Sequence, residues 1–327
     1  MSIKYSNATS KVKTLIDTIS QQVMKKELKV GDNILSINEA SNKYKVSRDT
    51  VFKAYNELKK TGVIDSTPQK GYFVKGEVNR VLLLLDTYSA FKQNLYNSFA
   101  GNLPEGYKVD LIFHQYNELL FETILRESIG KYSVYVVMNF SDTQFSDTLK
   151  LIPSGRLLLL DFGNFEKSEL NYICQDFDVA LYNCLTEALP VLRKYRKLIY
   201  IKPQESNHPE SSKSYFRQFC SDNGFESEIY STKTDWQRPE KGNMYLCITA
   251  DDMVKVIKMA DESKLEIGQE AGILMYNDDP VFDVIKNGIS SVSIDFGLMG
   301  EKAAQFVKTR CPIQEYLPTN LILRGSV

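Results

Sequence analysis

From residue 80 onward, apolar runs of strand length alternate with segments of helix length, and this alternation limits the possible folds most strongly. Residues 81–85 and 157–160 are examples of such runs. An uninterrupted apolar strand is typical of a parallel sheet that helices cover on both faces. We expect strands at residues 80–86, 108–114, 134–139, 156–162, 197–202, 225–230, 244–249, 271–277, 292–295 and 321–323. About 250 residues are too many for one small sheet, so the sequence predicts two doubly wound lobes with a ligand cleft between them.

The first 76 residues follow a different pattern, of three short helices and a hairpin. Helical spacing of apolar residues predicts the first helix, with a stripe made of Val12, Leu15, Ile16, Ile19 and Val23. Ser36 and Glu39 have the spacing of a capping box for a second helix, and Ser47 is placed to cap a third. Two short apolar runs then flank a turn that ends at Gly71. This order predicts a winged helix-turn-helix, whose third helix enters the major groove of DNA. The alternative is a small helical domain that binds protein.

Charge is distributed unevenly along the chain. Residues 1–76 hold 14 Lys and Arg against 7 Asp and Glu, whereas the remaining residues hold 26 against 34. The formal net charge of −1 for the whole chain hides this difference. A basic head on an acidic body indicates that the head binds a polyanion. We therefore favour duplex DNA over a protein partner for the head.

The residues that usually mark an enzyme or a metalloprotein are missing. Five widely spaced cysteines without a C-x-x-C pair argue against a disulfide framework and a zinc ribbon, and predict reduced core residues. Only two histidines, His114 and His208, are present, and the P-loop, G-x-G-x-x-G, H-E-x-x-H and G-x-S-x-G motifs are not. We therefore expect no catalytic residues, no metal and no cofactor.

No part of the sequence resembles a targeting or membrane segment. The longest apolar runs are far shorter than the roughly 20 residues that a membrane span needs. The opening residues Met-Ser-Ile-Lys-Tyr do not resemble a signal peptide. We expect a cytoplasmic protein without a membrane partner.

Polar and aromatic residues follow many of the expected strands. They include Asp86 with Tyr88, Asn139, Asp161, Asp176, Asp251 with Asp252, and Asn277 to Asp279. Carboxylates accept hydrogen bonds from the neighbouring hydroxyls of a sugar, and the only tryptophan, Trp236, offers an aromatic plate for its C–H face. Asp and Asn are also common in turns and helix caps after strands, so each one alone has a structural explanation.

Residues 10–75 resemble the DNA-binding domain of the GntR family of bacterial transcription regulators. Four blocks in order carry the resemblance: 35–40 (LSINEA), 46–51 (VSRDTV), 58–64 (LKKTGVI) and 71–74 (GYFV). In one position, Asn38, many members of the family have an arginine. The resemblance implies contacts to DNA bases or phosphates from Ser36, Asn38, Ser47, Arg48, Thr50, Lys53, Lys70 and Gly71.

Residues 80–327 resemble the sugar-binding domain of LacI-type regulators, which is similar to periplasmic sugar-binding proteins. The resemblance rests on 159–162 (LLDF), 235–236 (DW), 250–251 (AD), 276–279 (YNDD) and 295–300 (DFGLMG). Ala250 replaces the usual Asn, and no arginine stands near residues 211–213, where Lys213 or His208 is a possible substitute. Together with the strand-end residues, the resemblance implies a ligand site made of Tyr88, Phe91, Asn139, Asp161, His208, Trp236, Asp251 and Asp278.

The combination resembles arabinose- or fucose-responsive regulators. It predicts a DNA-binding domain at residues 1–76 and an effector and dimerisation domain at residues 77–327. The expected function is that of a homodimeric repressor of carbohydrate-utilisation genes that binds a pseudo-palindromic operator. A neutral monosaccharide, a pentose or deoxyhexose such as L-arabinose or L-fucose, would close the lobes about hinges near residues 161–176, 291–294 and 318–321.

Two other functions fit parts of the sequence. Some GntR-headed proteins carry an aminotransferase-like body that binds pyridoxal phosphate. Such a body needs a Schiff-base lysine and a phosphate cup, and is usually longer than this one. The other alternative is a scaffold whose lobes bind only proteins.

Overall fold

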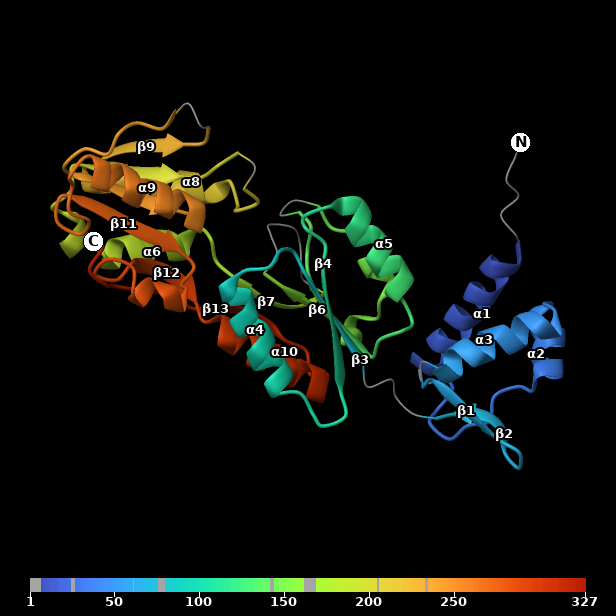
Figure 1. The fold of residues 1–327 in the computed structure, drawn as a ribbon. Coiled ribbons are helices and arrows are strands. Elements are labelled where there is room, and N and C mark those ends of the chain that lie inside the picture. Colours follow the sequence, from blue (N-terminus) through green and yellow to red (C-terminus); the bar gives the residue numbers. More distant parts are fainter. Residues whose placement is uncertain are drawn as a thin grey trace, which may run out of the picture. The chain divides into compact units, whose positions relative to one another are not determined.

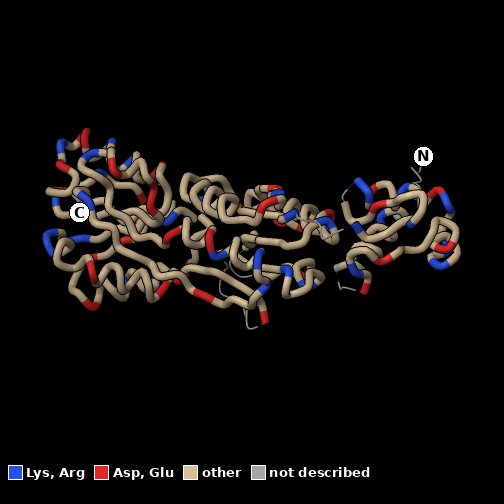
Figure 2. Tube along the Cα trace, turned by 90° about the horizontal axis from the view of Figure 1, so that it is seen from below, with Lys and Arg blue, Asp and Glu red and all other residues tan. Residues whose placement is uncertain are grey.

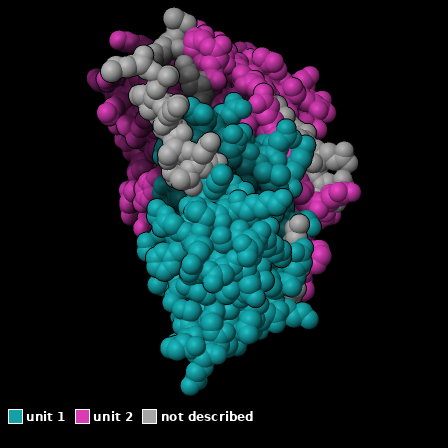
Figure 3. All heavy atoms as spheres, turned by 90° about the vertical axis from the view of Figure 1, so that its right-hand side faces the viewer, with its two compact units in different colours: residues 1–85, 104–137, 146–158 teal, residues 86–103, 138–145, 159–327 magenta. Residues whose placement is uncertain are grey.

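The computed structural model describes residues 7–24, 27–60, 62–75, 80–141, 144–161, 169–204, 206–232 and 235–327 (Figure 1). It contains a small N-terminal head followed by two six-stranded sheets with flanking helices. By its internal contacts the chain divides into two compact units, which Figure 3 shows in two colours. Unit 1 comprises residues 1–85, 104–137 and 146–158, and unit 2 comprises residues 86–103, 138–145 and 159–327.

The head is a winged helix-turn-helix. Its elements are α1 (Asn7–Met24), α2 (Ile37–Tyr44), α3 (Arg48–Lys60), β1 (Ile64–Thr67) and β2 (Gly71–Val74). The apolar stripe of α1 packs against α2, α3 and the hairpin, so that residues such as Leu15, Val51 and Tyr55 are buried. Strands β1 and β2 pair antiparallel, with Ile64 opposite Val74. The three helices and the hairpin that the sequence predicted are confirmed.

The first sheet has the strand order β13-β7-β6-β5-β3-β4. Its strands are β3 (Arg80–Leu85), β4 (Lys108–Phe113), β5 (Val134–Met138), β6 (Leu157–Leu160), β7 (Asn171–Gln175) and β13 (Gln314–Leu317). The helices of this part are α4 (Ala90–Gly101), α5 (Glu118–Ser128) and α10 (Phe296–Thr309), with short 3-10 turns at Leu149–Leu151 and Ser154–Arg156. Strand β3 pairs in parallel with β4 and with β5, and β7 pairs in parallel with β13.

Helices α4 and α10 lie side by side, although some 200 residues separate them in the sequence (Figure 1). Ser98 Oγ donates a hydrogen bond of 2.7 Å to the carbonyl oxygen of Gly297. At Gly300 a Cβ atom would lie 2.3 Å from the carbonyl oxygen of Leu95, so only glycine allows this close approach.

The second sheet has the strand order β14-β12-β11-β10-β8-β9. Its strands are β8 (Lys197–Ile201), β9 (Glu226–Tyr230), β10 (Asn243–Cys247), β11 (Ala271–Tyr276), β12 (Ser290–Ile294) and β14 (Thr319–Ile322). Its helices are α6 (Val179–Glu187), α7 (Leu189–Leu192), α8 (Ser211–Asn223) and α9 (Ala250–Glu262), with a 3-10 turn at Pro280–Asp283. Strands β8 to β12 pair in parallel, whereas the edge strand β14 is antiparallel to β12.

Helices cover both faces of the second sheet, as its uninterrupted apolar strands require. Leu198 and Tyr200 of β8 pack in the core that α6, α7 and α8 share, whereas Ile199 and Ile201 pack in the core under α9. Successive residues of one strand therefore lie in different cores, and all are buried.

The chain passes between the two sheets three times: from β7 to α6, from β12 to α10, and from β13 to β14. The hinge segments predicted at 291–294 and 318–321 adjoin two of these crossings, and the segment predicted at 161–176 ends beside the third. Residues 162–168 of that segment, and the domain boundary predicted between residues 76 and 77, lie outside the described residues.

The structure corrects two expectations about strands and one about cysteines. Strands β7 and β13 were not among the expected strands, and β14 makes the second sheet mixed instead of purely parallel. None of the five cysteines forms a disulfide, but Cys311 is exposed, so only four of them are core residues. No helix among the described residues has the length and apolar character that a membrane span requires.

Candidate functional site

The surface of the head that the sequence assigned to DNA is made of α3, the start of α2 and the wing. Arg48 begins α3 and is exposed, as is Lys53 one turn later. Lys53 Nζ lies 2.8 Å from the Asp49 carboxylate on the same face. At the wing, Lys70 Nζ lies 4.6 Å from the centroid of the Phe73 ring. Figure 2 shows how Lys and Arg residues recur along the head.

Two of the predicted DNA contacts also cap helices. Ser36 Oγ accepts a hydrogen bond from the backbone N–H of Glu39 at 3.3 Å, and the Glu39 carboxylate accepts one from the backbone N–H of Ser36 at 2.8 Å. This is the capping box that the sequence predicted. Ser47 Oγ accepts a hydrogen bond from the backbone N–H of Thr50 at 3.1 Å, which begins α3 as predicted.

Thr50 is placed differently from the other predicted DNA contacts. It is only 7% exposed, and its hydroxyl lies 2.8 Å from that of Ser47. The side chain therefore fixes the start of α3 instead of facing outward. The remaining predicted residues of this group, Asn38 and Gly71, are exposed, and Gly71 has a φ of 72° where the wing turn enters β2.

In unit 2, several buried polar atoms have no hydrogen-bond partner among the described residues. Four of them are connected through direct contacts or charge effects and lie at or beyond the carboxyl ends of strands: Asp161 Oδ1, Gln175 Oε1, His208 Nε2 and Tyr276 Oη. We call these four side chains the unpaired cluster. Buried polar atoms are nearly always bonded in folded proteins, so such a group indicates a place for a ligand or ordered water.

Asp161 is the acidic member of the unpaired cluster. Its Oδ2 accepts a hydrogen bond of 3.0 Å from Gln175 Nε2, and its backbone has a φ of 49°. Burial raises the pKa of Asp161 to about 6, and the nearby charge of Asp86 acts in the same direction. Asp86 itself forms a buried ion pair with Lys92.

Aromatic rings surround Tyr276, which is the last residue of β11 and a member of the unpaired cluster. The Phe177 ring stacks on it at a centroid distance of 6.0 Å, and the His208 ring meets it edge-on at 4.4 Å. Burial lowers the pKa of His208 to about 3, helped by the charge of Lys202, so that the imidazole is neutral at pH 7. Burial also raises the pKa of Tyr276, so its hydroxyl keeps its proton.

The positive charge beside this cluster is already compensated. Lys202 follows β8, is fully buried, and forms an ion pair with Glu210. Lys213 Nζ lies 2.8 Å from the same Glu210 carboxylate. Of the two substitutes considered for the missing arginine, Lys213 is thus held by Glu210, and His208 is uncharged.

A separate pocket of about 340 Å³ lies beside Trp236, in the second sheet's part of unit 2. Its lining combines the ends of β8 and β9 with the start of α9, and includes Tyr230, Trp236, Asp251, Asp252 and Lys255. Lys255 Nζ lies 3.5 Å from the centroid of the Trp236 ring. The structure thus brings two predicted ligand residues, Trp236 and Asp251, to one pocket.

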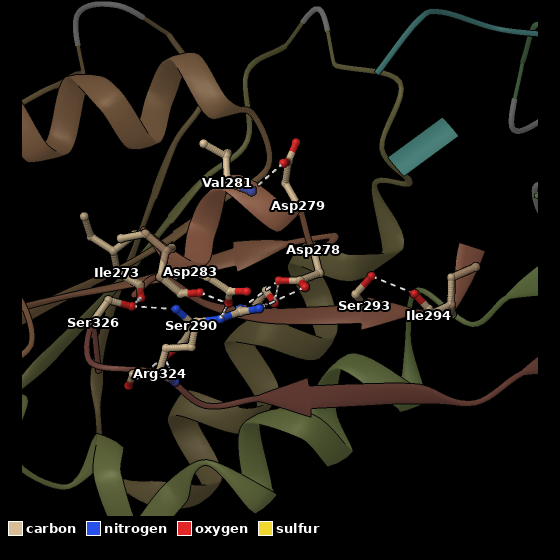
Figure 4. A network of polar contacts seen from close by, with 12 residues as sticks. Ile273, Asp278, Asp279, Val281, Asp283, Ser290, Ser293, Ile294, Arg324 and Ser326 are labelled. Atoms are coloured by element: carbon tan, nitrogen blue, oxygen red, sulfur yellow. Dashed lines mark hydrogen bonds and ion pairs between the residues drawn. The ribbon is translucent and has the colours of Figure 1, made fainter. Parts of the chain in front are cut away.

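Asp278 belongs to a closed network instead (Figure 4). Arg324 donates to both of its carboxylate oxygens, at 2.8 and 3.1 Å, and Ser291 Oγ donates to Oδ1 at 2.5 Å. Arg324 also donates to Asp283 at 2.5 Å. Unlike Asp161, Asp278 therefore has protein partners on both oxygens.

The other three predicted ligand residues differ in exposure. Asn139 is buried, and its Nδ2 donates to the carbonyl oxygens of Ser141 and Gln144 at 2.6 Å each, while its Oδ1 has no partner among the described residues. Phe91 packs on Phe296 at a centroid distance of 4.5 Å. Tyr88 is 65% exposed.

Sequence reasoning missed Gln175 and Phe177, and took Tyr276 only as part of a motif. Gln175 and Tyr276 end strands β7 and β11, and a polar residue at the end of a parallel strand is the signal that identified Asp161. Among the described residues, no group of three or more His, Cys, Asp and Glu side chains is arranged to hold a metal ion.

Two family profiles match the chain. Residues 11–74 match the profile of bacterial regulatory proteins of the gntR family, and residues 191–327 match that of the periplasmic binding protein-like domain. Among curated proteins, an uncharacterized HTH-type transcriptional regulator of Bacillus subtilis is 34% identical over 64 residues. This match spans 20% of the chain and only 14% of that relative.

Solved structures of similar fold include two described as LacI regulators. One, from Lactobacillus casei with bound sucrose, has a TM-score of 0.62 and 13% identity, and the match covers 76% of this chain and 99% of the other. The other, from Alkaliphilus metalliredigens in complex with D-xylulofuranose, has a TM-score of 0.60 and 12% identity, with coverages of 76% and 98%. The body thus has a periplasmic-binding-protein-like fold, which differs from the aminotransferase-like body of the enzymatic alternative.

Proposed function

We propose that this protein is a repressor of carbohydrate-utilisation genes and that a neutral monosaccharide controls it. It is a DNA-binding transcription regulator, in which a gntR-family helix-turn-helix domain is joined to a periplasmic-binding-protein-like domain. It acts in the cytoplasm as a homodimer whose two heads bind the half-sites of a pseudo-palindromic operator. A pentose or a deoxyhexose, such as L-arabinose or L-fucose, is the effector. The predicted domains, residues 1–76 and 77–327, divide these two tasks.

The unpaired cluster is the observation that carries the effector proposal. An unsatisfied buried polar group costs about 1–3 kcal/mol, and a ligand that bonds to it recovers that cost. Asp161 Oδ1 and Gln175 Oε1 are acceptors, and the Tyr276 hydroxyl both donates and accepts. Sugar hydroxyls, which donate and accept as well, match this set.

The surrounding charges favour a neutral ligand over an acidic one. Lys92, Lys202 and Arg324 each form an ion pair with a carboxylate of the protein. An anion beside Asp161 would therefore meet a carboxylate without gaining an unpaired cation. The bound sugars of the two structural relatives agree with this choice of ligand class.

Control of DNA binding follows from linkage. A sugar that binds one arrangement of the lobes tenfold more tightly shifts operator affinity by up to about 1.4 kcal/mol per coupled site, if that arrangement excludes DNA binding. For a repressor of sugar-utilisation genes, sugar lowers operator affinity. Fluorescence anisotropy of a labelled operator with and without sugar measures the sign; a rise in affinity would contradict the repressor proposal.

Tyr276→Phe is the sharpest test of the site. The change removes a hydroxyl that has no partner among the described residues, so the free energy of unfolding is expected to stay constant or rise. The effector is first found by a thermal-shift screen of neutral monosaccharides, in which a sugar at 100 times its Kd stabilises by about 2.7 kcal/mol. Calorimetry should then show affinity about fivefold to tenfold weaker for Tyr276→Phe, the loss of roughly one hydrogen bond.

Tyr200→Phe is the matched control. Its hydroxyl is buried like that of Tyr276 but lies 3.0 Å from Ser212 Oγ. This variant should lose about 1 kcal/mol of stability and keep its sugar affinity. Operator binding without any sugar response would contradict the effector proposal alone, and the absence of both would favour the scaffold alternative.

A further inference from the structure

Phe52 is an exposed aromatic residue on a helix whose other apolar side chains are buried. The other four, Val51, Ala54, Tyr55 and Leu58, are at most 1% exposed, whereas Phe52 is 48% exposed. The fold of the head therefore does not require a phenylalanine at this position. Single exposed apolar side chains are common on protein surfaces, so the inference rests on where Phe52 lies among the predicted DNA contacts.

The helix geometry places Phe52 beside the predicted DNA contacts. Phe52 is four residues after Arg48 and three after Asp49, and residues at these spacings share one side of a helix. Arg48, Asp49 and Lys53 are all exposed. Lys53 pairs with Asp49 at 2.8 Å, so Phe52 lies between an arginine and a compensated pair of charges.

We propose that Phe52 contacts the C5-methyl group of a thymine in the major groove and thereby determines operator sequence. The inference rests on the proposed function, in which α3 is the recognition helix. Thymine is the base that presents a methyl group in the major groove, and phenylalanine side chains make apolar contacts with it. The basic side chains of the head contact phosphates, which hold the helix in place without reading sequence.

A second protein surface is the alternative partner for Phe52, and the charges of the head argue against it. The head holds 14 Lys and Arg against 7 Asp and Glu, and three exposed charged residues adjoin Phe52. The core of a protein interface is depleted of charged residues, whereas a base-reading surface carries them.

The test removes the methyl group alone. An operator is selected in vitro from random duplexes with the full wild-type chain, and each thymine of one half-site is replaced in turn by deoxyuridine. At one of these positions we expect the wild type to bind the deoxyuridine operator about fourfold more weakly than the thymine operator. This factor corresponds to the roughly 0.8 kcal/mol of one buried methyl-sized group. Phe52→Ala should bind the thymine and deoxyuridine operators equally, and Phe52→Leu should retain part of the difference.

The controls separate the possible failures. Circular dichroism and size measurements verify that Phe52→Ala is folded and has the oligomeric state of the wild type. If no operator is selected, the proposed function fails. If an operator binds but each deoxyuridine substitution affects wild type and Phe52→Ala equally, only the thymine contact is wrong. A change in oligomeric state of Phe52→Ala with an unchanged deoxyuridine pattern would assign Phe52 to a protein interface and overturn the proposal.

Discussion

Asp161 and Asp278 occupy similar positions in the sequence but differ in their hydrogen-bond partners in the structure. Asp161 directly follows the apolar strand β6, and Asp278 lies two residues after the apolar strand β11. Both oxygens of Asp278 accept hydrogen bonds from Arg324, whereas Asp161 has one bond from Gln175 and one oxygen without a partner among the described residues. The Asp278 network thus completes the architecture, and the Asp161 cluster leaves polar atoms for a ligand.

The largest expected effect is a pH dependence that belongs to Asp161. Its pKa is raised from 3.8 to about 6 in the folded chain, so folding favours the protonated carboxyl. This contribution to stability is complete below pH 4 and is lost as the pH rises to 6. Asp161→Asn, which imitates the protonated form, should have the stability of wild type near pH 4 and exceed it by about 3 kcal/mol at pH 7. Urea unfolding over this pH range measures the difference.

Glu301→Gln provides the control, because Glu301 is exposed on α10. The difference in the free energy of unfolding between Glu301→Gln and wild type should stay constant over the same pH range. If the stability difference between Asp161→Asn and wild type is also independent of pH, the carboxylate of Asp161 is as well bonded as that of Asp278. The contrast between the two aspartates would then be wrong.

Arg324→Met tests the other side of the comparison. Removing the guanidinium leaves Asp278 without its main partner, and breaking such a partly buried pair should cost about 2 kcal/mol of stability. Arg324 is 16% exposed at its side chain and pairs with Asp283 as well. Thermal unfolding should show a midpoint several degrees lower than that of wild type.

Lys241→Met is the matched surface variant. Lys241 lies 3.2 Å from Glu270 but is 76% exposed, so its loss should cost less than about 0.5 kcal/mol. Equal, small losses for both variants would show that the Asp278 network is not structural. Asp278 would then return as a candidate for ligand binding.

The fold could be predicted largely from the sequence because burial on both sides of a strand leaves a continuous apolar run. Strands such as β3 and β6 were predicted within one or two residues. Strand β7 begins and ends with Asn171 and Gln175, and β13 is the partly exposed edge segment 314–317, so neither has such a run. The composition of an edge strand also does not indicate whether the strand pairs in parallel or antiparallel, which is why β14 was not expected to be antiparallel.

The candidate site was predictable only in part, because whether a polar residue is satisfied depends on partners far along the chain. Asp278 pairs with Arg324, 46 residues later, and no local pattern indicates this. Thr50 stays a predicted DNA contact, but the structure adds that its hydroxyl lies 2.8 Å from that of the capping residue Ser47. Gln175 and Tyr276 became candidates only when the structure showed them buried with atoms left unpaired.

The smallest expected effect is a change in sugar affinity at the Trp236 pocket, which tests whether the ligand also reaches that pocket. Lys255 Nζ lies 3.5 Å from the centroid of the Trp236 ring, and both residues line the pocket. A cation–π contact at an exposed site is worth about 0.5–1 kcal/mol, which a stacking sugar would have to replace. Lys255→Met should therefore tighten sugar binding about threefold in calorimetry, whereas Lys258→Met, exposed one turn later on α9, should leave it unchanged. If affinity is the same in all three proteins, the sugar does not use Trp236, and the unpaired cluster around Tyr276 accounts for binding alone.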